Sequence, residues 1–254
     1  MSNNEEGRYI YGITAARHKQ ELGPIGIGGR EDIVYKVPYQ DIAAIVSHSP
    51  IISYPVTREN AIAHATVLEK AGEEGTVLPV RFCTIADSEE MIVEKVLKPR
   101  YQEFIDALRD MEGKVELGVR ARWIDLNAIF GEIVEENEDI KSLKAALLHE
   151  EDKQKKYAGT VKIGQMVQER LDEKRKKEAE ELIKALEPLS LSWKENQVHG
   201  DMNIVNAAFL VTREKVGEFD QKILDLEKAY EGRKRLKYIS SSVPYNFVEI
   251  EIQF

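Results

Sequence analysis

Short hydrophobic runs, separated by polar or glycine-rich breaks, fill the first half of the chain. Runs that alternate, or that are rich in β-branched and aromatic residues, predict strands. They cover residues 9–13, 33–37, 42–47, 76–82 and 115–124. The short link between the second run and the third predicts an antiparallel hairpin. The fourth run contains Pro79, which has no N–H to donate, so we expect this strand at a sheet edge or in an irregular position.

Two helices separate these runs. Thr57 is a suitable N-cap for the first, which we expect to end at Gly72 or Gly75 in a left-handed C-cap. A second helix is predicted over residues 89–111, and Pro99 should kink it or split it in two. In order, these elements give β–β–β–α–β–α–β, which is close to a βαββαβ unit with one extra strand.

Helical periodicity continues through residues 125–187. The stretch 153–187 alone would form a helix about 50 Å long at 1.5 Å per residue. Residues 168–181 contain only Leu171 and Ala179 as apolar side chains, and opposite charges recur there four positions apart. A helix this polar must project into solvent over part of its length. Pro188 should end it.

The last quarter of the chain alternates again and predicts a second, smaller α+β unit. Strands are expected over residues 189–193, 204–211, 236–240 and 247–252, with an amphipathic helix over 213–230. The sequence therefore predicts an α+β fold in three parts. These are an N-terminal α+β domain over 1–124, a helical segment over 125–188 and a C-terminal α+β domain over 189–254.

Charge and cysteine content narrow the function. The chain has 45 acidic and 36 basic side chains, for a net charge of −9, which argues against general binding of nucleic acid or anionic lipid. Cys83 is the single cysteine, so no internal disulfide forms and a reducing compartment is indicated. Residues 1–8 are polar, and no apolar run reaches the length of a membrane span. We therefore expect a cytoplasmic protein.

Motifs for cofactor or metal binding do not emerge from the sequence. No HExxH or CxxC pattern occurs. The glycine cluster at 23–29 resembles a dinucleotide-binding loop, but a predicted strand follows where phosphate binding needs a helix N-terminus. We therefore expect no cofactor and no metal.

One short basic run stands out near the C-terminus. Residues 233–237 carry four basic side chains beside Tyr238 without an acidic neighbour in sequence. Such a patch could bind RNA or an acidic partner. Charged residues also blunt strand edges against unwanted pairing, which is the commoner role.

Five segments, in order along the chain, resemble the gas vesicle protein F/L family. The most recognisable is the stretch 76–84 that follows His64; the others are residues 9–13, 115–120, 206–211 and 244–248. The resemblance spans nearly the whole chain. It does not distinguish F-like from L-like members.

The resemblance implies two modified ferredoxin-like domains with antiparallel sheets and a helical insertion. It also implies a non-enzymatic accessory or minor structural protein of the gas vesicle, in the cytoplasm. The expected partners are the small hydrophobic shell protein and other accessory proteins, with no nucleic acid and no membrane. Covering apolar shell protein requires exposed strand or helix edges for docking.

Partner-binding candidates are charged and aromatic residues of the recognised segments and of the basic run. They are Arg81, Phe82, Arg233, Lys234, Arg235, Tyr245 and Phe247. Phe247 continues an alternating strand and is equally suited to a core position. Arg81 is equally suited to a structural ion pair.

The sequence departs from the family pattern at two places, and each departure predicts a local difference in this protein. Cys83 stands where the family usually has glycine, so the backbone there should be less free in this protein. Residues 240–243 replace a run that bears glycine and tryptophan, which puts any partner contact of that run in doubt.

Two other functions stay open at this point. One is a ferredoxin-like small-molecule sensor or regulatory module, with a ligand on a sheet face or in a domain cleft. The other is an enzyme that uses Arg81 and His64 at a cleft between domains, with Cys83 nearby as a nucleophile.

Overall fold

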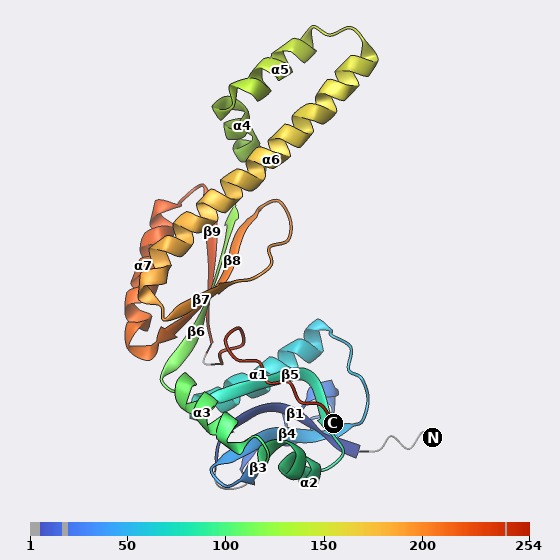
Figure 1. The fold of residues 1–254 in the computed structure, drawn as a ribbon, viewed down its shortest axis with the longest axis vertical. Coiled ribbons are helices and arrows are strands. Elements are labelled where there is room, and N and C mark those ends of the chain that lie inside the picture. Colours follow the sequence, from blue (N-terminus) through green and yellow to red (C-terminus); the bar gives the residue numbers. More distant parts are fainter. Residues whose placement is uncertain (1–5, 17–19, 242) are drawn as a thin grey trace. The chain divides into compact units, whose positions relative to one another are not determined.

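The computed structural model describes residues 6–16, 20–241 and 243–254 (Figure 1). Its contacts form two compact units. The first contains Leu210–Arg213, Ser240–Phe254 and the described part of Met1–Leu117; the second contains Gly118–Phe209 and Glu214–Ile239. The units are therefore interleaved along the chain. The division of the chain into domains 1–124, 125–188 and 189–254 stays a prediction.

A five-stranded antiparallel sheet forms the centre of the first unit, in the order β2-β3-β4-β1-β5. Its strands are β1 (Glu6–Ala15), β2 (Glu21–Gly23), β3 (Val34–Tyr39), β4 (Ile42–Pro50) and β5 (Val77–Ala86). The predicted hairpin is confirmed, because β3 and β4 pair from Val34 opposite Ser47 to Tyr39 opposite Ile42. β5 lies at the sheet edge, as Pro79 indicated.

Helices cover both faces of this sheet. They are α1 (Arg58–Glu74), α2 (Glu89–Ile92), a π-helical turn (Val93–Leu97) and α3 (Tyr101–Met111). α1 packs with Tyr9 and Tyr11 of β1, whereas α2 and α3 pack with Ile10 and Ile13. Removal of these apolar side chains from water on both faces stabilises the unit.

Local sequence signals place the helix ends, with one exception. The Thr57 hydroxyl accepts from Asn60 N at 3.2 Å and so caps α1 as predicted. The predicted helix over 89–111 is split around Pro99, as expected. The expected left-handed C-cap is wrong, because α1 ends before Gly75 and this residue has φ 171°. An extended residue here leads the chain directly into β5.

A four-stranded antiparallel sheet with the order β7-β8-β6-β9 is the second sheet of the fold. Its strands are β6 (Lys114–Trp123), β7 (Ser192–Glu195), β8 (Asn203–Thr212) and β9 (Lys234–Ser241). The sequence groups residues 115–124 with the strands of the first domain, but β6 pairs in this second sheet, between β8 and β9. The two strands that flank β6 come from the last quarter of the chain, so no local sequence pattern predicts this pairing.

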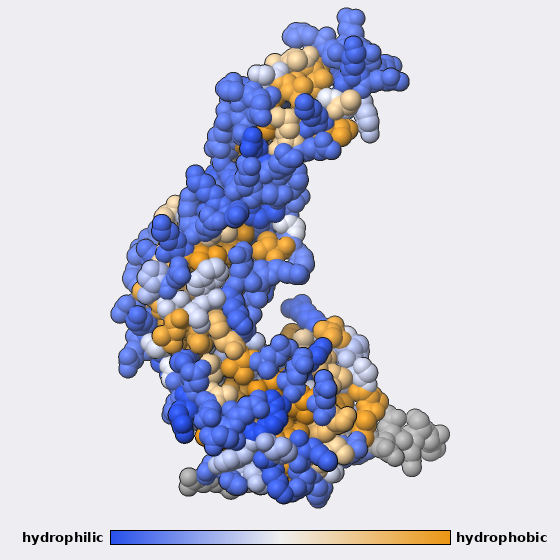
Figure 2. All heavy atoms as spheres, in the orientation of Figure 1, coloured by the Kyte–Doolittle hydropathy of each residue, from blue (hydrophilic) through white to orange (hydrophobic). Residues whose placement is uncertain are grey.

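Helices complete the second unit. They are α4 (Leu126–Glu136), α5 (Glu138–Leu148), α6 (Lys153–Leu186) and α7 (Val216–Ala229), with 3₁₀ turns at Glu187–Leu189 and Arg213–Lys215. α4 and α5 run back along α6 (Figure 1). The first residue of the 34-residue α6 to be buried is Leu171, and hydrophilic residues cover most of this helical part in Figure 2. The long polar helix is therefore confirmed.

The last predicted strand, over 247–252, is wrong. The amides of Phe247 and Val248 both donate to Pro244 O at 3.0 Å and close a turn. Beyond it, Ile250 forms one isolated parallel bridge with Val80 of β5. The α+β class, with two antiparallel sheets and one long helix, is confirmed.

Candidate functional site

A wide bulge in β5 shapes the surface where several candidate residues lie. Ile10 of β1 pairs with Thr84 of β5, and Gly12 pairs with Pro79. The chain therefore advances by two residues on β1 and by five residues on β5 between these two pairs. Cys83 closes the bulge with φ 66°, the left-handed region that favours glycine. This conformation gives a physical reason for a glycine at this position.

Tyr9 anchors the bulge from the middle of the sheet. Its hydroxyl accepts from Cys83 N at 2.8 Å and lies 3.0 Å from His64 Nδ1 on α1. Burial lowers the pKa of His64 to about 4, although a backbone hydrogen bond at Val80 acts in the opposite direction. His64 is therefore neutral at pH 7.

A depression beside this bulge gathers three of the predicted partner-binding residues. It is lined by His64, Pro79, Val80, Arg81, Phe82, Tyr245, Val248 and Glu249. Phe82 packs its ring edge against His64, with centroids 5.6 Å apart. Arg81 is exposed and pairs with Glu251 at 3.0 Å. The structure thus brings Arg81, Phe82 and Tyr245 together, and it places Phe247 elsewhere, against the core beneath α2 and α3.

The C-terminal basic run divides between two roles. Arg233 binds both Glu132 and Glu178, the latter at 2.7 Å. Lys234 is buried, pairs with Glu178 at 3.0 Å and lies 4.1 Å above the Tyr230 ring. The expectation of an uncompensated patch is therefore wrong for these two residues, because carboxylates from α4 and α6 reach them. Arg235, the next residue, is exposed.

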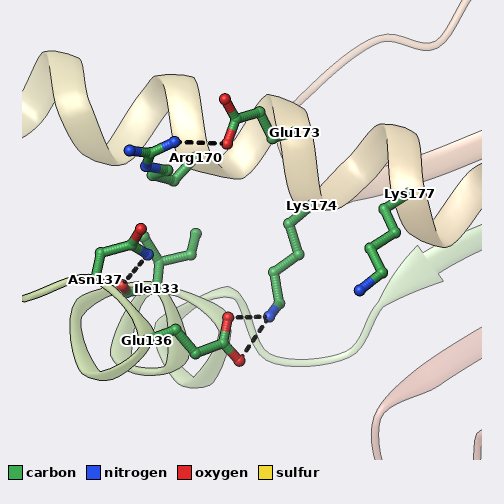
Figure 3. A pocket seen from close by; sticks show the side chains of 7 residues that line it. All are labelled: Ile133, Glu136, Asn137, Arg170, Glu173, Lys174 and Lys177. Carbon is green, nitrogen blue, oxygen red and sulfur yellow. Dashed lines mark hydrogen bonds and ion pairs between the residues drawn. The ribbon is translucent and has the colours of Figure 1, made fainter.

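A second depression lies between α4 and α6, in the helical part of the second unit (Figure 3). It is lined by Ile133, Glu136, Asn137, Arg170, Glu173, Lys174 and Lys177. Most of its charges are already paired, with Arg170 to Glu173 and Lys174 to Glu136, both at 2.9 Å. These contacts hold α4 against α6.

The residues named for an enzyme do not form a catalytic arrangement. His64, Arg81 and Cys83 all lie in the first unit. The Tyr9 hydroxyl occupies His64 Nδ1, and the Cys83 thiol accepts from Tyr54 N at 3.2 Å instead. A nucleophile needs its base within hydrogen-bond reach, and the structure shows no such contact between the described side chains of Cys83 and His64.

Across residues 6–16, 20–241 and 243–254, no three His, Cys, Asp or Glu side chains come together as a metal site would require. In the same ranges, no helix combines the length and apolar character needed to cross a bilayer.

A family model described as gas vesicle synthesis protein GvpL/GvpF matches residues 7–249. The chain belongs to this family. The resemblance seen in the five sequence segments is therefore confirmed. Membership assigns the protein to gas vesicle formation, in a family whose members are generally structural and not catalytic.

Individual members of the GvpL/GvpF family match over nearly their full length. Gas vesicle protein F1 of Halobacterium salinarum is 30% identical over 250 residues, which is 97% of this chain and 95% of that protein. Gas vesicle protein F of Nostoc sp. is 25% identical over 246 residues, with 96% and 98% covered. The crystal structure of GvpF from Anabaena sp. superposes with a TM-score of 0.78 at 25% identity, covering 96% of this chain and 99% of that one.

Proposed function

We propose that this protein is a non-enzymatic accessory or minor structural component of gas vesicle formation. It acts in the cytoplasm, at the gas vesicle, and it binds the small hydrophobic shell protein and other accessory proteins during assembly. Family membership supports the role in gas vesicle formation. The observation that carries the binding role is the depression that gathers Arg81, Phe82 and Tyr245 beside an edge strand.

This depression has the composition of a protein-binding surface. Aromatic residues and arginine dominate binding energy at interfaces, and two aromatic rings here adjoin an exposed arginine. The Arg81–Glu251 pair has both side chains more than half exposed. Exposed pairs contribute about 0–1 kcal/mol, so Arg81 can exchange Glu251 for a carboxylate of a partner at little cost.

The edge of β5 offers backbone groups as well. Arg81 N donates to Ile250 O at 3.1 Å, and Ile250 N donates to Pro79 O at 3.2 Å. This contact covers β5 at one point, through a segment that forms no strand of its own. An extended partner segment could take the same place by strand addition.

A modified ferredoxin-like topology in each unit belongs to the same proposal. Its support is the antiparallel pairing of both sheets together with helices packed on them. In the five-stranded sheet, α1 follows β4 and leads into β5, as a helix does in a βαββαβ unit.

Direct binding to the shell protein tests the function. Immobilised shell protein should retain the purified wild-type protein, and Phe82→Ala and Arg81→Glu should each weaken retention at least tenfold. Lys95→Glu is a matched control, because Lys95 is exposed in the same unit on the π-helical turn, away from the depression. No retention of the wild-type protein would reject the proposal. Equal losses in the control and the two test variants would reject the site.

A further inference from the structure

We infer that the open face of β6 and β9 binds an acidic segment of a partner polypeptide. Four cations line one depression on this face: Arg120 and Arg122 of β6, with Arg235 and Lys237 of β9. All four belong to the second unit. The inference is independent of shell-protein binding at β5.

Strand alternation shows which way these four side chains face. On β6, Trp123 bonds Glu178 of α6, so the residues beside it in sequence point to the opposite face of the sheet. On β9, the Tyr238 hydroxyl donates to Asp220 of α7 at 2.5 Å, which likewise turns Lys237 away from the helices. Both helices therefore lie on one face, and the four cations lie on the other.

Cross-strand contacts pair like charges. Ile124 N donates to Arg233 O at 3.0 Å, and Gly118 lies against Ile239. These two contacts fix the register of β6 against the antiparallel β9. In this register Arg122 lies opposite Arg235, and Arg120 lies opposite Lys237. Like charges directly opposite one another destabilise a sheet, and here two such pairs are adjacent.

No carboxylate relieves this repulsion within the described part of the chain. Arg120 donates to Asn206 Oδ1 at 3.1 Å, which is a neutral partner. No ion pair links Arg122, Arg235 or Lys237 to any described residue, and the depression has no acidic lining residue. An unrelieved cluster in a chain of net charge −9 is unfavourable for folding alone, and an anionic occupant would relieve it.

The face favours a polypeptide over RNA. Proteins that hold single-stranded RNA on a sheet stack its bases on aromatic side chains, and none of the residues that line this depression is aromatic. Ile239 lies beside Gly118, and its side chain is 44% exposed. It adds an apolar residue next to the four cations. Cations spaced along two strands and flanked by an apolar residue suit an extended segment with alternating carboxylates, because its acidic side chains recur about every 6.8 Å.

A labelled peptide of alternating Glu and Thr tests the inference directly on the full chain. We expect saturable binding that weakens with added salt, and at least tenfold weaker binding by an Arg122→Ala/Arg235→Ala variant. The matched control is Lys215→Ala/Lys228→Ala, beside and on α7, which should bind as the wild type does. A peptide with Gln in place of Glu should not bind.

Thermal unfolding separates binding from folding. Removing two of four facing cations should leave the Tm of the variant unchanged or raise it. A lower Tm would mean that the cations have a structural role and would overturn the inference. So would equal peptide binding by the variant and the wild type, absence of peptide binding by the wild type, or tighter binding of a single-stranded RNA than of the peptide. Self-association abolished by the same substitutions would name a second copy of this chain as the acidic partner.

Discussion

The indole Nε1 of Trp123 donates to Oε2 of Glu178 across 2.9 Å in the interior of the second unit. The same carboxylate accepts from Arg233 at 2.7 Å and from Lys234 at 3.0 Å. Glu178 is 6% exposed, so its charge is balanced by protein groups in place of water. One carboxylate on α6 thus holds the end of β6 and the start of β9 in place.

Replacing Glu178 by Ala should destabilise the second unit severely. The substitution leaves the buried Lys234 without a charge partner and Arg233 with Glu132 alone. Breaking a buried pair on one side costs about 3–5 kcal/mol. We expect a loss of about 3 kcal/mol in the free energy of unfolding, measured by urea denaturation. Glu181→Ala, at an exposed position on the same helix, should change it by less than about 0.5 kcal/mol. Equal effects of the two substitutions would contradict the role given to Glu178.

The contribution of Glu178 should also depend on pH. Burial acts to raise the pKa of Glu178, but hydrogen bonds from Arg233, Lys234 and Trp123 outweigh burial and hold the pKa below its usual value. A carboxyl with a lowered pKa in the folded state stabilises the protein above its unfolded-state pKa, about 4.3. That stability is lost as pH falls further, through the folded-state pKa.

Unfolding free energies of the wild type and Glu178→Gln, measured between pH 7 and pH 3, check this sign. The difference between the two proteins should be constant above about pH 5 and should shrink below about pH 4. A difference that stays constant down to pH 3 would show that the carboxylate charge contributes nothing to stability.

The sequence predicts those elements whose signals are local. The Thr57 cap, the split at Pro99 and the polar helix over 153–187 each depend on residues a few positions apart, and each was confirmed. The pairing of Arg233 depends on carboxylates 101 and 55 residues away in sequence. No pattern around residues 233–237 reveals such partners, so the sequence alone predicts an uncompensated run.

Sheet membership was beyond local patterns for the same reason. Residues 115–124 have the alternation of a half-buried strand, and β6 fulfils it, but alternation does not say which strands lie beside it. The pairing of Arg233 and Lys234 with carboxylates, and the exposure of Arg235 and Lys237, also follow from the neighbours of β9. The i, i+2 spacing of Arg120 and Arg122, and that of Arg235 and Lys237, is the local signal for the cationic face.

The conformation of Cys83 predicts an unusual response to mutation. A non-glycine residue at φ 66° costs about 1 kcal/mol or more, and a β-branched side chain costs more still. We expect Cys83→Gly to be at least as stable as the wild type, although it loses the contact from Tyr54 N to the thiol. Cys83→Val should be less stable than Cys83→Gly by about 2 kcal/mol in chemical denaturation. Equal stability of the Gly and Val variants would refute backbone strain at this position.

Glu116 fixes the C-terminal segment to the first unit, which predicts a local effect when it is removed. Its carboxylate accepts from Asn246 N at 2.7 Å and from Asn246 Nδ2 at 2.6 Å. Glu116→Ala leaves both donors without this acceptor, so the contact of Ile250 with β5 should open more often. Hydrogen exchange at the amides of Arg81 and Ile250 should become at least tenfold faster, with β1 amides unchanged. Glu112→Ala, at an exposed position before β6, should leave exchange unaltered, and equal acceleration by both variants would contradict the role of Glu116.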